Sequence, residues 1–346
     1  METVLVTGSG GYIGSVLVPK LIQHGFHVKA IDRYFFGMDK LIQHPQLELI
    51  KEDSRRLTPL HFSDVDYVID LVAISNDPSG ELFSDATWQI NHASRVNTAR
   101  LAKEAHVKRY ILPSSCSIYG FQDHLVDERS AINPLTIYAK ANAQAEHDIL
   151  PLADDQFNVT IMRQATVFGY SPRMRFDLAI NGMVYGAWKN HVLPLMRDGK
   201  QYRPMVHVQD TTDVMLLLLT VDPSTINRQI FNVGGNDNNY QLGALGDTIA
   251  DEVSKRLNTP IKIDWYGDID HRSYQVNFDK IKTILSWQPQ WNAQRGAQEM
   301  IDKLISNELV KSMQTITLNW YKELEKWRNI IKEVEMYGGI LNIENY

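Results

Sequence analysis

The chain has 346 residues, 44% of them hydrophobic and 22% charged, and its formal net charge of −6 without a long basic run argues against nucleic-acid binding. The length allows one large domain or two modest ones, and the single cysteine, Cys116, excludes an internal disulfide and is typical of a reducing cytoplasm. Because no signal-peptide pattern opens the chain and the longest apolar run, VMLLLLTV at 214–221, is too short to span a bilayer, we expect a soluble, cytoplasmic protein.

The first half of the chain alternates short apolar strands with helical patterns. We expect strands at 3–7, 27–32, 47–53, 65–73, 109–115 and 158–169. Helices are expected between them at 15–25, 86–106 and 136–150. Near-continuous apolar strands separated by helices are typical of a parallel sheet that is covered on both faces.

The regular alternation of strands and helices ends after Gly169. Short strands at 205–210 and 229–235 flank an apolar helix near 211–221. We interpret 171–300 as a smaller, mixed α/β substrate domain, with segments near 205–235 returning to pack on the first domain, 1–170. The remainder, 301–346, is amphipathic and rich in Trp and Leu, and we expect a helical extension that covers a surface of the fold or a partner subunit.

A glycine-rich loop lies between the first strand and the first helix. TGSGGYIG places Gly8, Gly11 and Gly14 where the backbone must turn tightly and where the helix N-terminus presents free N–H groups to a pyrophosphate. The next strand ends in Asp32, whose carboxylate suits the ribose hydroxyls of NAD and repels the 2′-phosphate of NADP. Arg33 beside it weakens that preference, and Asp53, after the third strand, is either an adenine contact or a surface residue.

Ordered motifs extend this pattern through the chain: TGSGGYIG, DLVAISNDPS, INHAS, PSSCSIYG, PLTIYAKAN and RPMVHVQD. Together they resemble the extended short-chain dehydrogenase/reductase family, in particular its nucleotide-sugar epimerases and dehydratases, over about residues 3–300. The resemblance implies a Rossmann-type, doubly wound sheet that binds NAD, and a C-terminal domain that binds a nucleotide-diphosphate sugar. It also implies hydride transfer from a sugar carbon, often C4. Members commonly pair through two long helices, here 86–106 and 136–150, so a homodimer is expected.

The resemblance assigns the catalytic roles residue by residue. Tyr138 matches the general base, and Ser115 matches the residue that hydrogen-bonds the reacting hydroxyl. A tyrosine has an ordinary pKa near 10, so its phenolate needs a positive charge nearby. In the family that charge is a lysine one helical turn later, which also holds the nicotinamide ribose, and here the position is Asn142.

Asn142 can hydrogen-bond a ribose hydroxyl but carries no charge. Lys140 does not replace the lysine, because it lies roughly 200° around the helix from Tyr138. Either NAD⁺ alone lowers the tyrosine pKa, or a lysine or arginine from elsewhere supplies the charge, or the chain is a non-catalytic NAD-binding sensor or scaffold. The other motifs are intact, and we therefore favour an enzyme.

A second departure narrows the reaction. The family's 4,6-dehydratases place an Asp-Glu pair directly after the catalytic Ser or Thr, whereas this chain has Cys116 and Ser117. Neither can act as a carboxylate acid or base, so elimination of water is disfavoured. We expect an NAD-dependent nucleotide-sugar 4-epimerase that acts through a 4-keto sugar, with a C4 dehydrogenase or 4-ketoreductase as the alternative.

The remaining expected contacts divide between cofactor and substrate. For NAD they are Gly8, Gly11, Tyr12, Ile13, Gly14, Asp32, Arg33, Asp53, Ser54, Leu71, Ala73, Asn91, Tyr138 and Asn142. For the sugar nucleotide they are Ser75, Asn76, Ser115, Ser117, Thr166, Arg173, Arg175, Arg203 and Arg272. Guanidinium groups suit a diphosphate because they are planar and permanently charged, although these arginines could instead form salt bridges or surface charge. The eleven histidines show no metal-ligand spacing, and no metal is expected.

Overall fold

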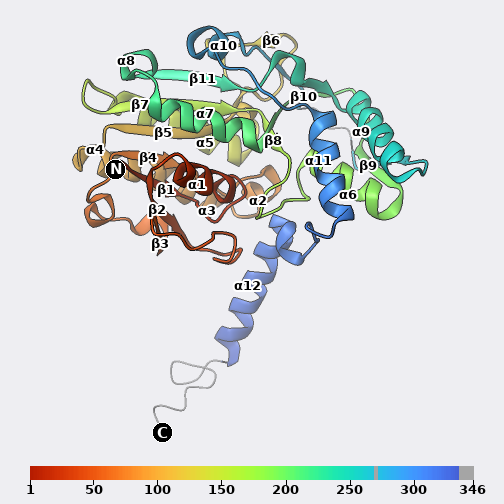
Figure 1. The fold of residues 1–346 in the computed structure, drawn as a ribbon, viewed down its shortest axis with the longest axis horizontal. Helices are drawn as coiled ribbons and strands as arrows, with labels where there is room; N and C mark the ends of the chain where they lie inside the picture. The colour runs from red at the N-terminus through yellow and green to blue at the C-terminus, as the bar shows by residue number, and fades with distance from the viewer. Residues whose placement is uncertain (269–271, 335–346) are drawn as a thin grey trace.

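The computed structural model describes residues 1–268 and 272–334. Within these ranges seven parallel strands form the central sheet, in the order β11-β7-β5-β4-β1-β2-β3 (Figure 1). The strands are β1 (Thr3–Thr7), β2 (His27–Asp32), β3 (Leu47–Lys51), β4 (Tyr67–Asp70), β5 (Arg109–Ser115), β7 (Asn158–Gln164) and β11 (Gln229–Val233). The order reverses between β1 and β4, which is the Rossmann-type switch point where such sheets bind ligands. The predicted fold class is confirmed.

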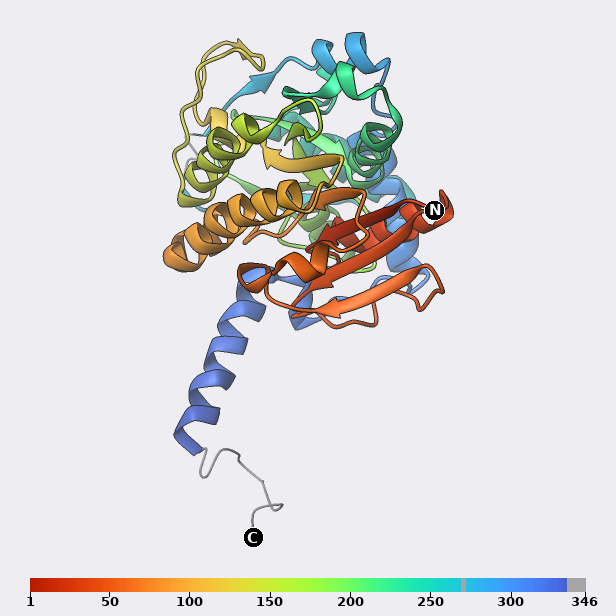
Figure 2. The same cartoon turned by 90° about the vertical axis from the view of Figure 1, so that its left-hand side faces the viewer.

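Helices cover both faces of this sheet. One face carries α1 (Gly14–Gln23) and α7 (Val208–Thr220), and the other carries α4 (Arg95–Glu104) and α5 (Ile137–Ile149) (Figures 1 and 2). Successive side chains of a strand point to opposite faces. Accordingly Val4 and Val6 join the cluster under α1 and α7, whereas Leu5 joins the cluster under α4 and α5.

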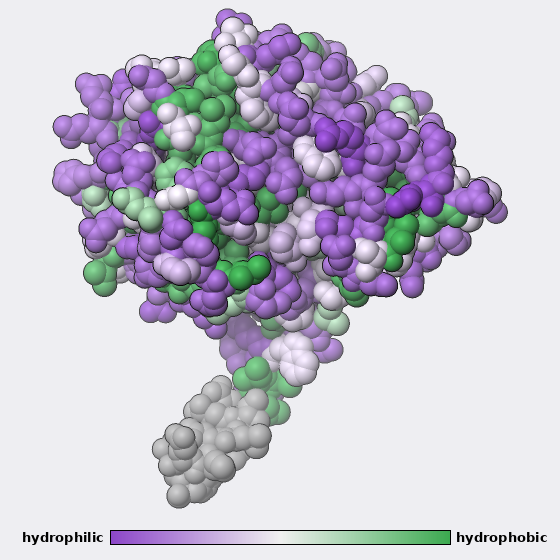
Figure 3. All heavy atoms as spheres, in the orientation of Figure 1, coloured by the Kyte–Doolittle hydropathy of each residue, from purple (hydrophilic) through white to green (hydrophobic). Residues whose placement is uncertain are grey.

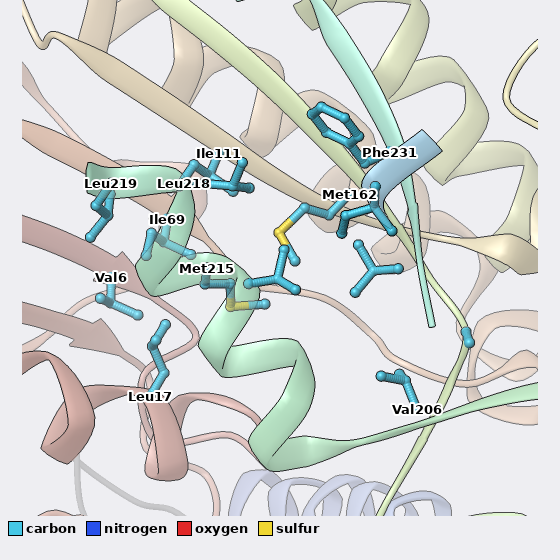
Figure 4. Packing of buried hydrophobic residues seen from close by; sticks show 14 of the residues in the cluster. Val6, Leu17, Ile69, Ile111, Met162, Val206, Met215, Leu218, Leu219 and Phe231 are labelled. Atoms are coloured by element: carbon cyan, nitrogen blue, oxygen red, sulfur yellow. The ribbon is translucent and has the colours of Figure 1, made fainter. Parts of the chain in front are cut away.

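The first of these clusters is fully apolar at its centre. Figure 4 shows Ile69 and Ile111 of the sheet lying near Met215 and Leu218 of α7, with Leu17 of α1 beside them. All five side chains are at most 1% exposed.

Smaller sheets and further helices form the rest of the body. β8 (Thr166–Phe168), β10 (Tyr202–His207) and β12 (Asn239–Gln241) form one sheet, and β9 (Val192–Met196) pairs with β13 (Lys262–Tyr266), while β6 (Leu125–Val126) pairs with β14 (Gln275–Val276). The helices are α6 (Ala179–Asn190), α8 (Pro223–Ile226), α9 (Leu242–Leu257), α10 (Asp279–Leu285) and α11 (Ala293–Ile305). Near the cavity lie the short α2 (Asp77–Leu82) and α3 (Ser84–Trp88).

Three predicted elements differ from the structure. The strand expected at 158–169 is divided, because β7 stays in the central sheet while β8 pairs with β10. The strand expected at 205–210 ends at His207, and Val208–Asp210 instead open α7. The helix expected at 86–106 contains a π-helical segment, Gln89–Ser94, between α3 and α4.

The last described helix, α12 (Thr317–Val334), projects from the body (Figures 1 and 2). Its first turns are anchored: the Trp320 indole N–H donates to the Phe35 carbonyl at 2.7 Å, and Tyr321 contacts the rings of Phe35, Phe36 and Phe83. Hydrophobic atoms lie on the surface of its outer part (Figure 3). Residues 335–346 of the predicted extension lie outside the described residues. Among the helices that are described, none is long and apolar enough to cross a membrane.

Candidate active site

A cavity of about 1410 Å³ opens at the carboxyl ends of the parallel strands. The glycine loop, the ends of β2, β4 and β5, the first turn of α5 and the loop after β8 line it. Residues from the beginning of α12 complete one wall, including Thr317 and Tyr321. This position is the expected ligand site of an open α/β sheet. The volume exceeds that of a typical single-ligand pocket, so two ligands can share it.

The glycine loop turns tightly and packs closely against the backbone around it, so side chains would not fit at Gly8 or Gly14. Gly8 has a φ of +67°, and a Cβ on it would lie 2.8 Å from the Val72 nitrogen. A Cβ on Gly14 would lie 2.5 Å from the carbonyl oxygens of Gly8 and Ser9. The Gly11 N–H donates to the Gly8 carbonyl at 3.0 Å, which closes the turn before α1 begins. These residues therefore fit the phosphates of NAD.

Asp32 is held at the edge of the same loop. Its two carboxylate oxygens accept hydrogen bonds from the Gly10 N–H at 3.0 Å and the Tyr34 N–H at 2.7 Å. Burial raises the pKa of Asp32 above its usual value, while these hydrogen bonds oppose the rise. The carboxylate is therefore oriented before any ligand binds, as a ribose contact requires.

The other residues expected at the cofactor end mostly line the cavity as well. Tyr12, Ile13, Arg33, Asp53, Ser54, Leu71 and Ala73 all do so. Asp53 pairs with Arg33 at 3.2 Å and with Arg55 at 2.6 Å, so part of its charge is already used by neighbours. The Tyr12 hydroxyl donates to the Gly169 carbonyl at 2.6 Å, which ties the loop helix to the second half of the chain.

Tyr138 lies in the first turn of α5 and faces the cavity. The helix begins there because the Thr136 hydroxyl accepts from the Ala139 N–H at 3.2 Å, and this hydroxyl also donates to Asp77 at 2.7 Å. Burial raises the pKa of Tyr138, whereas a hydrogen bond with Ser115 and the charge of Arg95 oppose that rise. The structure thus brings together the two predicted catalytic side chains, Tyr138 and Ser115.

Asn142 and Asn91 are fully within the protein and do not line the cavity. The Asn142 amide N–H donates to the Tyr138 carbonyl at 2.8 Å, and its oxygen accepts from the Arg95 guanidinium at 2.8 Å. Asn91 bonds both the N–H and the carbonyl of Ile74, at 2.8 Å and 3.0 Å. Neither amide is therefore presented to a ligand, and their predicted contacts with NAD stay predictions.

The predicted substrate residues all line the cavity. Arg175 donates to the Ser75 hydroxyl at 2.9 Å and pairs with Asp177 at 2.9 Å, and Asp177 also accepts from the Asn76 amide at 3.0 Å. The Ser117 hydroxyl has no hydrogen-bond partner among the described residues. Thr166 lies at the start of β8 and lines the same cavity.

The arginines occupy two different parts of the cavity. Arg203 donates to the Tyr202 carbonyl at 2.8 Å and also to the Arg272 carbonyl, while the Arg272 guanidinium contacts the Asp77 carboxylate. Arg173 lies instead beside the loop helix, where its backbone N–H donates to the Ser15 hydroxyl at 3.3 Å. Its guanidinium donates to Thr317 at 2.9 Å and lies 3.6 Å from the Phe36 ring. Burial lowers the pKa of Arg173 to about 9.

Sequence reasoning missed Arg95 and the contribution of α12. Arg95 is 2% exposed, although it was expected only as part of a long helix. A signal was present, since an arginine four residues after Asn91 falls on the helix face that the apolar pattern directs inward. For Tyr321 no local signal existed, because its contact with the cavity depends on how a segment more than 300 residues from Gly14 of the glycine loop folds back.

Comparisons with known proteins agree with this geometry. Residues 4–234 match the NAD dependent epimerase/dehydratase family. UDP-glucuronic acid decarboxylase 6 of Arabidopsis thaliana is 27% identical over 309 residues, covering 85% of this chain and 86% of the relative. The putative UDP-glucose 4-epimerase of Methanocaldococcus jannaschii is 24% identical, covering 88% of this chain and 99% of the relative.

A solved structure shares the fold. The UDP-glucuronic acid 4-epimerase from Bacillus cereus, solved with UDP-glucuronic acid and NAD, is similar to this chain with a TM-score of 0.79 at 20% identity, covering 88% of this chain and 99% of that one. The resemblance drawn from the motifs and the prediction of NAD as cofactor are both confirmed. Since the family match spans more than half of its length, this chain belongs to the NAD dependent epimerase/dehydratase family, whose members are enzymes.

Proposed function

We propose that this protein is a nucleotide-sugar 4-epimerase. One observation carries the proposal: the side chains of Tyr138 and Ser115 share one cavity with the glycine loop and with Arg203 and Arg272. A base and its hydroxyl partner therefore line the same cavity as a dinucleotide site and two cations. That arrangement suits a sugar held by its diphosphate next to NAD.

The residues that would hold NAD are the loop glycines and Asp32, for the reasons of space and orientation given above. When bound, NAD supplies a hydride acceptor that can return the hydride to the same carbon. The chain itself supplies the proton chemistry. Tyr138 would accept the proton of the C4 hydroxyl, Ser115 would hold that oxygen by a hydrogen bond, and the same phenol would return the proton afterwards.

The residues after Ser115 support a reaction without elimination. Cys116 is fully buried, its thiol donates to the Arg163 carbonyl at 3.1 Å, and burial raises the pKa of the thiol well above its usual value. It is therefore neither an acid-base group nor an activated nucleophile. Ser117 has a hydroxyl in place of a carboxylate.

Decarboxylation is the second candidate, because the 27% identical plant relative carries that name. The same first step at C4 would leave a ketone next to a carboxyl-bearing carbon, and such an acid can lose CO₂. The two reactions are distinguished by their products, since only decarboxylation of a uronic-acid sugar yields a pentose and CO₂. A C4 dehydrogenase or 4-ketoreductase would differ in releasing a keto or reduced product.

The test is a product assay with purified protein, NAD and a panel of UDP-, GDP-, CDP- and dTDP-sugars that includes UDP-glucuronic acid. A 4-epimer as the product supports the proposal, and a pentose with CO₂ supports the decarboxylase. Tyr138→Phe should lower turnover about 10²- to 10⁴-fold while NAD still binds. Tyr170→Phe is the matched control, since Tyr170 does not line the main cavity and should turn over normally. NAD binding without turnover of any sugar, over a range of pH, would make the chain a sensor or scaffold.

We also propose that two copies pair through the surface formed by α3, α4 and α5, which lies on the outer face of the sheet (Figure 2). This proposal rests on the way in which members of the family commonly pair, through two long helices. Sedimentation of the purified protein measures its mass directly, and a monomer at micromolar concentration would contradict the pairing.

A further inference from the structure

Asn142 occupies the position where the family has its lysine, and its contacts indicate which cation takes the lysine's place. The amide lies between two groups: its N–H donates to the Tyr138 carbonyl at 2.8 Å, and its oxygen accepts from Arg95 Nη1 at 2.8 Å. A guanidinium only donates hydrogen bonds, so the amide orientation is determined by its partner. Asn142 thus connects the backbone of the catalytic turn of α5 to a buried cation on α4.

Arg95 is directed inward by the local helix geometry. The π-helical segment Gln89–Ser94 directly precedes it, and Asn91, Ser94 and Arg95 all contact groups at the carboxyl edge of the sheet. Arg95 Nε donates to the Val72 carbonyl at 2.9 Å and Nη2 to the Asp70 carbonyl at 3.4 Å. The acceptors that hold the guanidinium are therefore neutral oxygens.

The charge of Arg95 is not cancelled by an ion pair. In residues 1–268 and 272–334, no carboxylate lies within 4.0 Å of its guanidinium nitrogens. The charge of Arg95 opposes the rise that burial causes in the pKa of Asp70, but the Asp70 carboxylate itself accepts from the Thr7 hydroxyl and, at 2.5 Å, from the Tyr110 hydroxyl. Arginine stays protonated even when buried. A permanent positive charge therefore remains behind the first turn of α5.

We propose that Arg95 is a positioning residue: the Asn142 amide holds its guanidinium beside the position where the family has its lysine, and from there its positive charge acts through space to favour the Tyr138 phenolate. The inference rests on the proposed role of Tyr138 as the base. It assigns Asn142 a structural part in that base rather than a contact with the ribose.

Four groups act on the Tyr138 phenol from the elements around it. Ser115 at the end of β5 and Arg95 on α4 lower its pKa, as does Arg175 from the loop after β8, whereas Asp77 on α2 raises it. Burial has the largest effect and raises the pKa. The base works when deprotonated, so removing the Arg95 charge should raise the phenol pKa and lower the rate at neutral pH. At pH values below the phenol pKa, a rise of about one unit corresponds to a roughly tenfold loss of rate.

The test measures the phenol directly in the NAD-loaded protein. Phenolate absorbance is titrated with pH in each variant, and the titration of the same variant carrying Tyr138→Phe is subtracted. Arg95→Gln should raise the Tyr138 pKa by about one unit, and Arg95→Gln with Asn142→Lys should restore it. An unchanged phenol pKa in Arg95→Gln would overturn the proposal, as would a failure of the added lysine to restore it.

A second variant covers the case in which Arg95→Gln does not fold. Asn142→Asp has nearly the same shape, keeps an acceptor for Arg95 and neutralises the Arg95 charge, while it loses the N–H that donates to the Tyr138 carbonyl. It should raise the phenol pKa and move the rising limb of the pH-rate profile to higher pH, and a profile identical to that of the unchanged protein would contradict the inference.

The two proposals fail separately. If the phenol pKa shifts as expected but no sugar is converted, the proposed function falls and the role of Arg95 stands. If sugars are converted and Tyr138→Phe abolishes conversion, while Arg95→Gln leaves the phenol pKa unchanged, the reverse holds.

Discussion

At the cofactor end of the cavity, the groups that would hold the ligand are close together in the sequence. Gly8, Gly11 and Gly14 lie within one turn, and Asp32 comes at the end of the next strand, hydrogen-bonded to Gly10. At the catalytic end, the groups around Tyr138 come from α2, α4, the end of β5 and the loop after β8.

This difference determines which substitutions each end of the cavity can tolerate. The cofactor end depends on close backbone packing at Gly8 and Gly14, so a side chain at either position is harmful. The catalytic end depends on charge, which a residue on another element can supply. Where the family has its lysine, Asn142 donates to the Tyr138 carbonyl and accepts from the buried Arg95 guanidinium, so a cation from another helix lies beside that position.

The largest expected effect is at the catalytic end, where one buried ion pair joins three elements. Glu146 on α5 lies 2.8 Å from Arg163 on β7 and accepts a hydrogen bond from Ser114 on β5. Arg163→Met leaves the Glu146 charge buried and should lower the free energy of unfolding by about 3–5 kcal/mol, measured by urea denaturation. Adding Glu146→Gln should recover part of this loss. A single-variant loss below about 1 kcal/mol, the usual size for surface pairs, would show that the pair is solvated.

Asp32→Asn comes next and acts on the cofactor end. The amide has the same shape but lacks the charge that favours a hydrogen bond from a ribose hydroxyl, which is worth about 1.5–3 kcal/mol. NAD affinity should therefore fall about ten- to hundredfold, and the preference for NAD over NADP should narrow, as measured by calorimetry. Asp53→Asn is the control, because Arg33 and Arg55 already occupy that carboxylate. Equal losses for both variants would mean that Asp53 holds the cofactor as strongly as Asp32.

Gly14→Ala tests whether the steric limit on side chains explains why the loop needs glycine. The new Cβ would lie 2.5 Å from two backbone oxygens, which cannot rotate away, so we expect a loss of about 1–3 kcal/mol of stability and weaker NAD binding. Gly11→Ala should cost less, because its nearest contact is 3.0 Å. Thermal unfolding and NAD titration of the two variants check the order, and a reversed order would contradict the steric account.

The smallest expected effect is at the beginning of α5. Thr136→Ala removes the hydroxyl that caps the helix and contacts Asp77, so stability should fall by about 1 kcal/mol. Thr136→Ser keeps the hydroxyl, so its stability should fall by less in the same denaturation experiment. If the alanine variant loses several kcal/mol, the contact with Asp77 matters more than the cap.

The amino-acid sequence by itself determined the parallel sheet, the glycine loop, Asp32 and the positions of Tyr138 and Ser115, because these depend on local periodicity and on motifs of short span. It did not determine where β7 ends and β8 begins, since both segments are apolar and only the pairing of β8 with β10 separates them. Nor did it place Arg95 behind Tyr138 or Tyr321 against the cavity. Those positions depend on the packing of helices and chain segments that are distant in the sequence, and spacing along the chain carries no information about which of them meet.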